Sequence, residues 1–505
     1  MNDLNSTNLI LGFFSHTTWD NIDAIMSILG TVGIILTAVL YAMSKYKVYK
    51  INKRKQDILK NEYILVCGLG ENNRIYIDSE IKNNFKDIII IEKNKNNPYI
   101  QHYIDKGVSV IIADATDIAI LKMLNIFKSK YIIISTNNDM INLEIATQIL
   151  LIDEDIKLYV HIEDRSLRHF HKENGILKNS NSKLYSYNED ASREVFEVYD
   201  IDGNDNKIID SKDNFVIVIM GNTNLAYEVV SQACIMGQLP NENKLTIYCI
   251  DKDIDSFKNN IELNYTQIQN VPNITIKYIS LDINSKDCYL HSLWKENITN
   301  IILCFKNSQT NLDIASNLSN ITYLEQIADN TFTINIIIAM FNEYNLSNII
   351  KDNNTSFSNF YIFGNINNIC DKKYIIEEQR DKRAIATNEV YNENIKETNP
   401  KKVKKWEERS YFEQESNRAS SDHIKIKQKY LKLYSIDNVI EKLAKCEHNR
   451  WNAYHFLNGW KFSKEIVKEK KLHNCLVNYN ELSEDIKDYD REMVSNIEKI
   501  IGGKN

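Results

Sequence analysis

Residues 63–74 read YILVCGLGENNR, and this stretch decides the fold of the first half of the chain. The first five residues are apolar and of strand length, and a helical segment follows the glycines. Gly68 permits a tight turn between strand and helix, and Gly70 lets the backbone come close to a pyrophosphate at the helix N-terminus. The stretch therefore predicts the first strand, turn and helix of a doubly wound α/β unit.

An acidic residue follows at the distance that a dinucleotide-binding unit needs. Residues 87–91 form a second apolar run, which ends at Glu92, 22 residues after Gly70. A carboxylate at this place would accept hydrogen bonds from ribose hydroxyls and disfavour a 2′-phosphate. Asn73 stands where the fingerprint has its third glycine. Two interpretations stay open: a working adenine-nucleotide site, or a fold that keeps only its shape.

The strand and loop pattern continues to residue 200. With the glycine turn, Glu92, the Asp114-Ala115 loop and the stretch 136–142, residues 62–200 resemble the TrkA-N, or RCK, domain of potassium-transport regulators. The resemblance implies that this part binds NAD or another adenine nucleotide, dimerises and moves a membrane partner. It also implies a set of contact residues: Gly68, Gly70, Asn73, Arg74, Glu92, Asp114, Ala115 and Thr136.

Roles for some of these residues follow from the same resemblance. Glu92 would hold the ribose, Asp114 and Ala115 would edge the adenine, and Thr136 would line the phosphate side. The alternative for Asp114 is turn capping, a common use of Asp in loops.

A second unit of the same order follows at residues 212–395. Its first strand ends in Gly221, a later strand ends in Asp251, and another leads into Asp282, which mirrors Asp114. A repeat of this size predicts a duplicated Rossmann-like domain, as in tandem RCK proteins. Only one glycine of the fingerprint remains, so a structural or dimerising role is favoured over ligand binding.

The segment 400–505 is predicted to be a small, mostly helical domain. A set of residues spread over about 85 positions stands out: Trp406, Asn417-Arg418, Glu447-His448-x-Arg450-Trp451, Gly459-Trp460, His473 and Lys487-x-x-Asp490-Arg491. In these residues the segment resembles the RyR domain, the repeat first named in ryanodine receptors. The resemblance implies a nucleotide-derived ligand. The candidate contacts are Asn417, Arg418, Glu447, Arg450, Trp451, Trp460 and His473.

The chemistry of these residues suits a nucleotide. Arg450 or Arg418 could grip a phosphate bidentately, and Trp451 or Trp460 could stack on a base. The alternative is that Glu447 and Arg450 form an internal ion pair while both tryptophans are core residues.

The N-terminal segment, residues 1–50, contains a run without charge. Residues 24–43 would span about 30 Å as a helix, the thickness of a bilayer core. Basic residues follow from Lys45 onward, and the preceding side has none. We therefore expect a single transmembrane helix with the N-terminus outside and the bulk of the chain in the cytoplasm.

Composition narrows the function. A net charge of −7 argues against direct nucleic-acid binding, and the 8 cysteines contain no Cys-x-x-Cys pair, so no metal site is expected. No nucleophile elbow, Walker lysine motif or metal triad indicates an enzyme, and no catalytic residue is assigned.

The favoured hypothesis is a membrane-anchored nucleotide sensor, such as an anti-phage effector. The alternative is a regulatory subunit for potassium or other ion transport. Expected partners are a small nucleotide ligand, the membrane, further copies of the chain, and a pore or signal-synthase protein.

Overall fold

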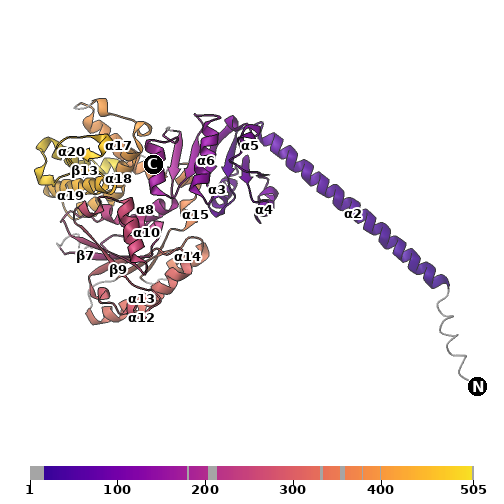
Figure 1. The fold of residues 1–505 in the computed structure, drawn as a ribbon, viewed down its shortest axis with the longest axis horizontal. Helices are drawn as coiled ribbons and strands as arrows, with labels where there is room; N and C mark the ends of the chain where they lie inside the picture. Colours follow the sequence, from indigo (N-terminus) through magenta and orange to yellow (C-terminus); the bar gives the residue numbers. More distant parts are fainter. Residues whose placement is uncertain are drawn as a thin grey trace, which may run out of the picture.

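The computed structural model describes residues 16–178, 181–202, 213–329, 334–352, 359–377, 379–397 and 400–502. Two parallel six-stranded sheets and a helical C-terminal part make up its body (Figure 1). This arrangement confirms the predicted fold class of two Rossmann-like units followed by a mostly helical part.

The first sheet has the strand order β3-β2-β1-β4-β5-β6, and all neighbouring strands are parallel. Its strands are β1 (Tyr63–Cys67), β2 (Ile88–Glu92), β3 (Ser109–Ile112), β4 (Ser129–Ile134), β5 (Leu158–His161) and β6 (Ser182–Tyr185). The helices are α3 (Glu71–Lys82), α4 (Ile100–Asp105), α5 (Ile118–Met123), α6 (Asp139–Leu150), α7 (Arg165–Glu173) and α8 (Tyr187–Val198). β1 and β2 are buried along their whole length, which is why they are unbroken apolar runs in the sequence.

The second sheet has the order β12-β11-β10-β7-β8-β9 and is also parallel throughout. Its strands are β7 (Phe215–Met220), β8 (Leu245–Asp251), β9 (Ile274–Ser280), β10 (Ile298–Leu303), β11 (Asn335–Ala339) and β12 (Phe360–Phe363). Its helices are α10 (Asn224–Met236), α11 (Ile254–Asn264), α12 (Lys286–Tyr289), α13 (Ser308–Asp329), α14 (Tyr344–Asp352), α15 (Ile366–Ile369) and α16 (Lys372–Ile375). When the strands of each unit are numbered from that unit's own first strand, the two sheets have the same strand order.

Matching contacts show that the two units are copies. The Leu69 N–H donates to Glu92 Oε2 at 2.8 Å, and the Asn222 N–H donates to Asp251 Oδ2 at 2.8 Å. Asn311 in the second unit ties the end of β10 to β11 by side-chain hydrogen bonds to Phe305 and Ala339. An asparagine in the first unit, Asn142, makes the same bonds to Thr136 and His161. The predicted duplication therefore extends to side-chain contacts.

The C-terminal part packs directly on both Rossmann units. It contains α17 (Lys382–Ile395), α18 (Tyr411–Leu431), α19 (Ile436–Leu457), α20 (Glu484–Ser495), α21 (Ile497–Gly502) and the short strands β13 (Lys461–Phe462) and β14 (Leu472–His473). α10 lies between α8 on one side and α18 and α19 on the other, and every residue of α10 after Asn224 is buried. The second unit thus shares its core with the helical part.

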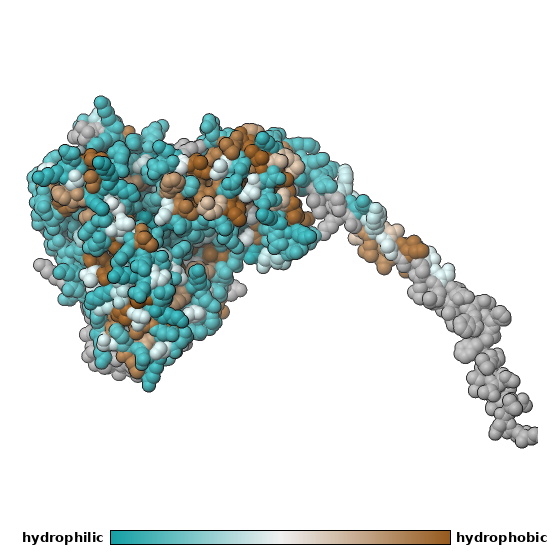
Figure 2. All heavy atoms as spheres, viewed as in Figure 1, coloured by the Kyte–Doolittle hydropathy of each residue, from teal (hydrophilic) through white to brown (hydrophobic). Residues whose placement is uncertain are grey.

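Exposed apolar side chains gather around α5 and α6 of the first unit (Figure 2). Met123, Phe127 and Leu151 are 54%, 63% and 71% exposed. Patches of large apolar side chains at a surface are characteristic of sites that contact other proteins.

The expected membrane span and orientation are wrong. No helix within the described residues combines the length and the apolar character needed to cross a bilayer. The uncharged run 24–43 instead lies inside α2 (His16–Ile58), one helix of 43 residues that projects from the body (Figure 1). α2 continues through the basic residues and meets the first unit, where Arg54 pairs with Asp87 at 2.8 Å. Residues 1–15 lie outside the described residues.

Candidate functional site

The glycine turn of the first unit is shaped by two residues of the predicted set. Gly68 has a φ of 97°, and a Cβ there would lie 2.9 Å from the Ser135 carbonyl oxygen, so only glycine fits. The Asn73 side-chain amide donates to the carbonyl oxygens of Cys67, Gly68 and Ser135 at 3.1, 2.9 and 3.0 Å. Asn73 is 1% exposed. The residue at the third glycine position therefore fastens the turn to β4.

Glu92 is occupied by protein donors. Its carboxylate accepts hydrogen bonds from the Leu69 and Asn94 N–H groups at 2.8 and 2.7 Å and from the Asn97 amide at 3.2 Å. A carboxylate offers about four acceptor positions, and a ribose diol needs two of them. Three of these positions are taken by protein donors, so Glu92 holds the turn together, and its ribose role stays a prediction.

The other predicted residues of this unit also have protein partners. The Arg74 guanidinium lies over the Tyr99 ring at 3.6 Å. Asp114 pairs with Lys93 at 2.6 Å, and hydrogen bonds from Lys93 and Thr116 lower the pKa of its carboxyl to about 2. The turn-capping role of Asp114 is present, since it accepts from the Thr116 N–H. Ala115 is buried, and the Thr136 hydroxyl donates to Asn142 Oδ1 at 2.6 Å.

A cavity of about 730 Å³ does lie at the carboxyl edge of the first sheet, where the second unit faces it. Of the predicted residues only Thr136 lines this cavity. α3 begins beside it, where Glu71 and Asn72 line the cavity, and the N-cap residue Gly70 makes no side-chain cap. His161 and Tyr187, which stack at 4.1 Å, also line the cavity and were not predicted.

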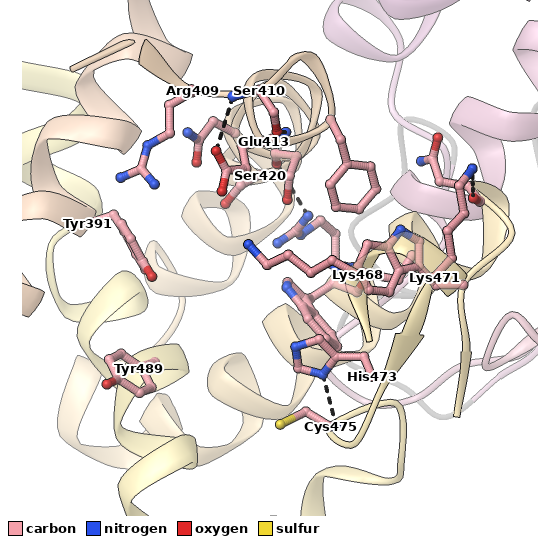
Figure 3. A pocket seen from close by; sticks show the side chains of 18 of the residues that line it. Tyr391, Arg409, Ser410, Glu413, Ser420, Lys468, Lys471, His473, Cys475 and Tyr489 are labelled. Carbon is pink, nitrogen blue, oxygen red and sulfur yellow. Dashed lines mark hydrogen bonds between the residues drawn. The ribbon is translucent and has the colours of Figure 1, made fainter. Parts of the chain in front are cut away.

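A larger cavity, about 840 Å³, lies in the C-terminal part (Figure 3). Its walls come from α17, α18, α19, α20 and the loop around β14, together with α7 of the first unit. Six of the seven residues predicted for the RyR-like module line it: Asn417, Glu447, Arg450, Trp451, Trp460 and His473.

A buried charge cluster forms one side of this pocket. Glu447 Oε1 accepts from Arg450 at 2.6 Å, and Glu447 Oε2 accepts from Lys427 at 2.6 Å. Burial opposes ionisation of Glu447, but the charges of Arg450 and Lys427 outweigh it and hold the pKa of the carboxyl below its ordinary value. The predicted internal ion pair therefore exists, and Glu447 orients the Arg450 guanidinium at the pocket.

Aromatic rings form a second side. The Trp451 ring lies 3.7 Å from the His455 ring and 5.0 Å from the His473 ring, centroid to centroid. Burial lowers the pKa of both histidines, so each is neutral near pH 7. Trp460 is nearly buried, with its ring 5.2 Å from that of Phe412. Trp451 remains partly exposed toward the pocket.

Two buried donor atoms on these walls lack a partner among the described residues. They are Arg450 Nε and Trp460 Nε1. Buried donors are nearly always hydrogen-bonded in native proteins, and an unpaired one costs about 1–3 kcal/mol. Both residues line the pocket, so a ligand could supply the missing acceptors.

Arg418 lies elsewhere. It grips Asp381 with two hydrogen bonds, at 2.8 and 2.6 Å, and also contacts Glu415. This cluster lies at the junction of the Rossmann units with the C-terminal helices. Arg418 is therefore a structural residue of the junction. It does not line the C-terminal pocket, so it is not placed to bind a phosphate there.

Several pocket residues were missed by sequence reasoning. Tyr391, Arg409 and Lys468 line the pocket, as do His169 and Phe170 of α7. Lys468 stands in the lysine-rich segment 464–471, which was the one signal available for it. The contribution of α7 carries no sequence signal, because it depends on how the modules pack.

Two domain families match the chain. The TrkA-N domain matches residues 64–180, and the RyR domain matches residues 401–503. A curated relative from Methanothermus fervidus, described as an uncharacterized protein, is 30% identical over 132 residues. That alignment covers 26% of this chain and 20% of the relative, so it spans about a fifth of the relative's length.

Solved structures with similar chains include a channel and a gating ring. The GsuK channel bound to NAD has 10% identity and a TM-score of 0.43, with 63% of this chain and 64% of that chain covered. The human SLO3 gating ring has 9% identity and a TM-score of 0.44, with 63% and 83% covered. The domain matches confirm that one part of the chain is of the TrkA-N type and another of the RyR type.

Proposed function

We propose that this protein is a regulatory protein that binds a nucleotide in the C-terminal pocket. The observation that carries the proposal is the pair of unpaired buried donors, Arg450 Nε and Trp460 Nε1, beside the partly exposed ring of Trp451. Phosphate or base acceptors would satisfy the donors, and every nucleobase offers a face on which an aromatic ring can stack.

The position of the pocket supports a regulatory role. α7 of the first unit supplies part of the wall, and Glu173 at its end accepts a hydrogen bond from the Phe412 N–H of α18 at 2.8 Å. A ligand here touches two modules at once. Its binding free energy therefore acts on the contact between them, which is the requirement for coupling two sites.

Isothermal titration calorimetry on the full chain tests the proposal, with AMP, ADP, NAD and cyclic di-AMP as probes. Lys468→Ala should weaken binding of the phosphate-bearing probes, while Lys464→Ala, in the same loop but outside the pocket, should not. Gly70→Ala is a control for the first unit, because a Cβ there meets only Asn137 Oδ1 at 3.7 Å. Absence of binding by all four probes would refute the proposal.

The TrkA-N match favours control of ion transport as the output. Domains of this type are regulatory ligand-binding domains of ion-transport systems. The partner would then be a channel or transporter subunit. Cross-linking in cells, followed by identification of the captured proteins, checks this: recovery of such a subunit supports it, and its consistent absence counts against it.

Self-association is the second partner proposal. The exposed side chains of Met123, Phe127 and Leu151 would be covered by another copy of the chain. Light scattering should show an oligomer that Phe127→Asp dissociates. The anti-phage role stays a prediction from architecture, because none of the matches bears on it.

A further inference from the structure

We infer that the C-terminal pocket takes a ligand with two bases joined through phosphate, a dinucleotide, in preference to a mononucleotide. This inference rests on the proposed function and narrows its ligand class. Figure 3 shows the reason: aromatic side chains stand on two opposite sides of the pocket, and a lysine extends between them.

The first aromatic station is formed by Trp451 and His473. The centroids of these two rings are 5.0 Å apart in an edge-on arrangement, and the His455 ring centroid lies 3.7 Å from that of Trp451. His473 is fixed, because its Nδ1 accepts the Cys475 N–H at 3.1 Å. A base entering here meets rigid, neutral rings, which favours stacking.

The second aromatic station is formed by Tyr391 of α17 and Tyr489 of α20. Both line the pocket, and both are only partly buried. Figure 3 places them together on the side opposite His473. The Arg409 guanidinium lies 5.3 Å from the centre of the Tyr391 ring. The two stations come from different segments of the chain and stand on opposite sides of the pocket in Figure 3.

A lysine lies between the stations, and an arginine stands beside the second one. Lys468 extends from the His473 side toward Tyr391, as Figure 3 shows, and no hydrogen bond or ion pair of its ammonium is recorded among the described residues. Arg409 is held in place by Asn388 and Asn392, each at 2.7 Å. Positive charge midway between two stacking surfaces matches a phosphate link between two bases.

The size of the pocket agrees with this ligand. Its volume of about 840 Å³ lies toward the upper end of the roughly 300–1,000 Å³ that small-molecule sites enclose. A mononucleotide would leave one station and part of the cationic region in contact with water.

The experiment compares NAD and cyclic di-AMP with AMP and adenosine on the full chain by calorimetry. The two dinucleotides differ in their linkage, so the arms distinguish a pyrophosphate bridge from a cyclic phosphodiester. At least one dinucleotide should bind about tenfold more tightly than AMP, as expected for one added stacking contact. Tyr489→Ala should remove that advantage, whereas Tyr489→Phe, which keeps the ring, should retain it. Trp451→Ala should weaken binding of AMP and the dinucleotides alike.

Two results would overturn the inference and leave the proposed function standing. One is AMP binding as tightly as both dinucleotides. The other is a dinucleotide advantage that persists in Tyr489→Ala. Failure of every probe to bind would overturn the inference together with the proposed function.

Discussion

The junction of the three modules should make stability depend on pH through one carboxyl group. Glu415 of α18 shares a hydrogen bond with Glu189 of α8. Burial raises the pKa of Glu415 to about 8; the Arg418 charge opposes this rise, and the Glu189 carboxylate adds to it. At pH 6.5 the group is therefore protonated in the folded protein and ionised in the unfolded chain.

The sign and size of the effect follow from proton linkage. An acid whose pKa is raised on folding favours the folded state while it is protonated. The stability that Glu415 contributes is therefore lost as the pH rises from the pKa of the group in the unfolded chain toward its pKa of about 8 in the folded protein. One pKa unit corresponds to about 1.4 kcal/mol, so raising the pH from 6.5 to 8.0 should lower the free energy of unfolding by roughly 1–2 kcal/mol.

Urea unfolding at pH 6.5, 7.25 and 8.0 measures this loss. Three of the five tryptophans, Trp406, Trp451 and Trp460, lie in the C-terminal part, so tryptophan fluorescence reports on it. Glu415→Gln cannot ionise and still offers a donor to Glu189, so its stability should not fall by this amount. Glu407→Gln, at an exposed position, should behave like the native chain. Equal pH dependence in the native chain and Glu415→Gln would refute the reasoning.

Four further substitutions test the packing. Gly107→Ala, at a φ of 90° with open space around it, should cost about 1 kcal/mol, and Gly68→Ala should cost clearly more, because its Cβ also meets the Ser135 carbonyl oxygen; chemical denaturation compares the two. Asn142→Ala should cost about 2–4 kcal/mol, because it removes side-chain bonds to Thr136 and His161; hydrogen exchange at β4 and β5 would show the loss locally. Glu447→Gln should cost about 3–5 kcal/mol, because Arg450 and Lys427 would keep buried charges without their counterion; an unchanged melting curve would contradict this expectation.

The sheets were predictable because a strand that is buried on both faces is a continuous apolar run in the sequence. β1 and β2 have this character, and Gly68 marks the turn that only glycine allows. The role of Asn73 was not predictable. Its three acceptors include the Ser135 carbonyl, 62 residues away, and no fingerprint records that contact.

The candidate site was predictable only in part. Trp451, Trp460 and His473 lie at one pocket because the RyR-like segment folds as a unit. Arg418 was misassigned because its partner Asp381 lies 37 residues upstream, outside the matched segment. Glu92 looked free in the sequence, and the loop that follows it supplies the Asn94 and Asn97 donors. Local sequence gives the type of a side chain, and tertiary packing decides which group it meets.

The burial of α10 on every side limits how this protein can be divided. Cutting the chain before α17 would remove α18 and α19 from α10, and the apolar side chains of α10 that they cover would then face water. A fragment made that way should aggregate. For the same reason, exchanging the C-terminal module for that of a distant relative would require matching changes along α10, so the parts are expected to diverge in concert.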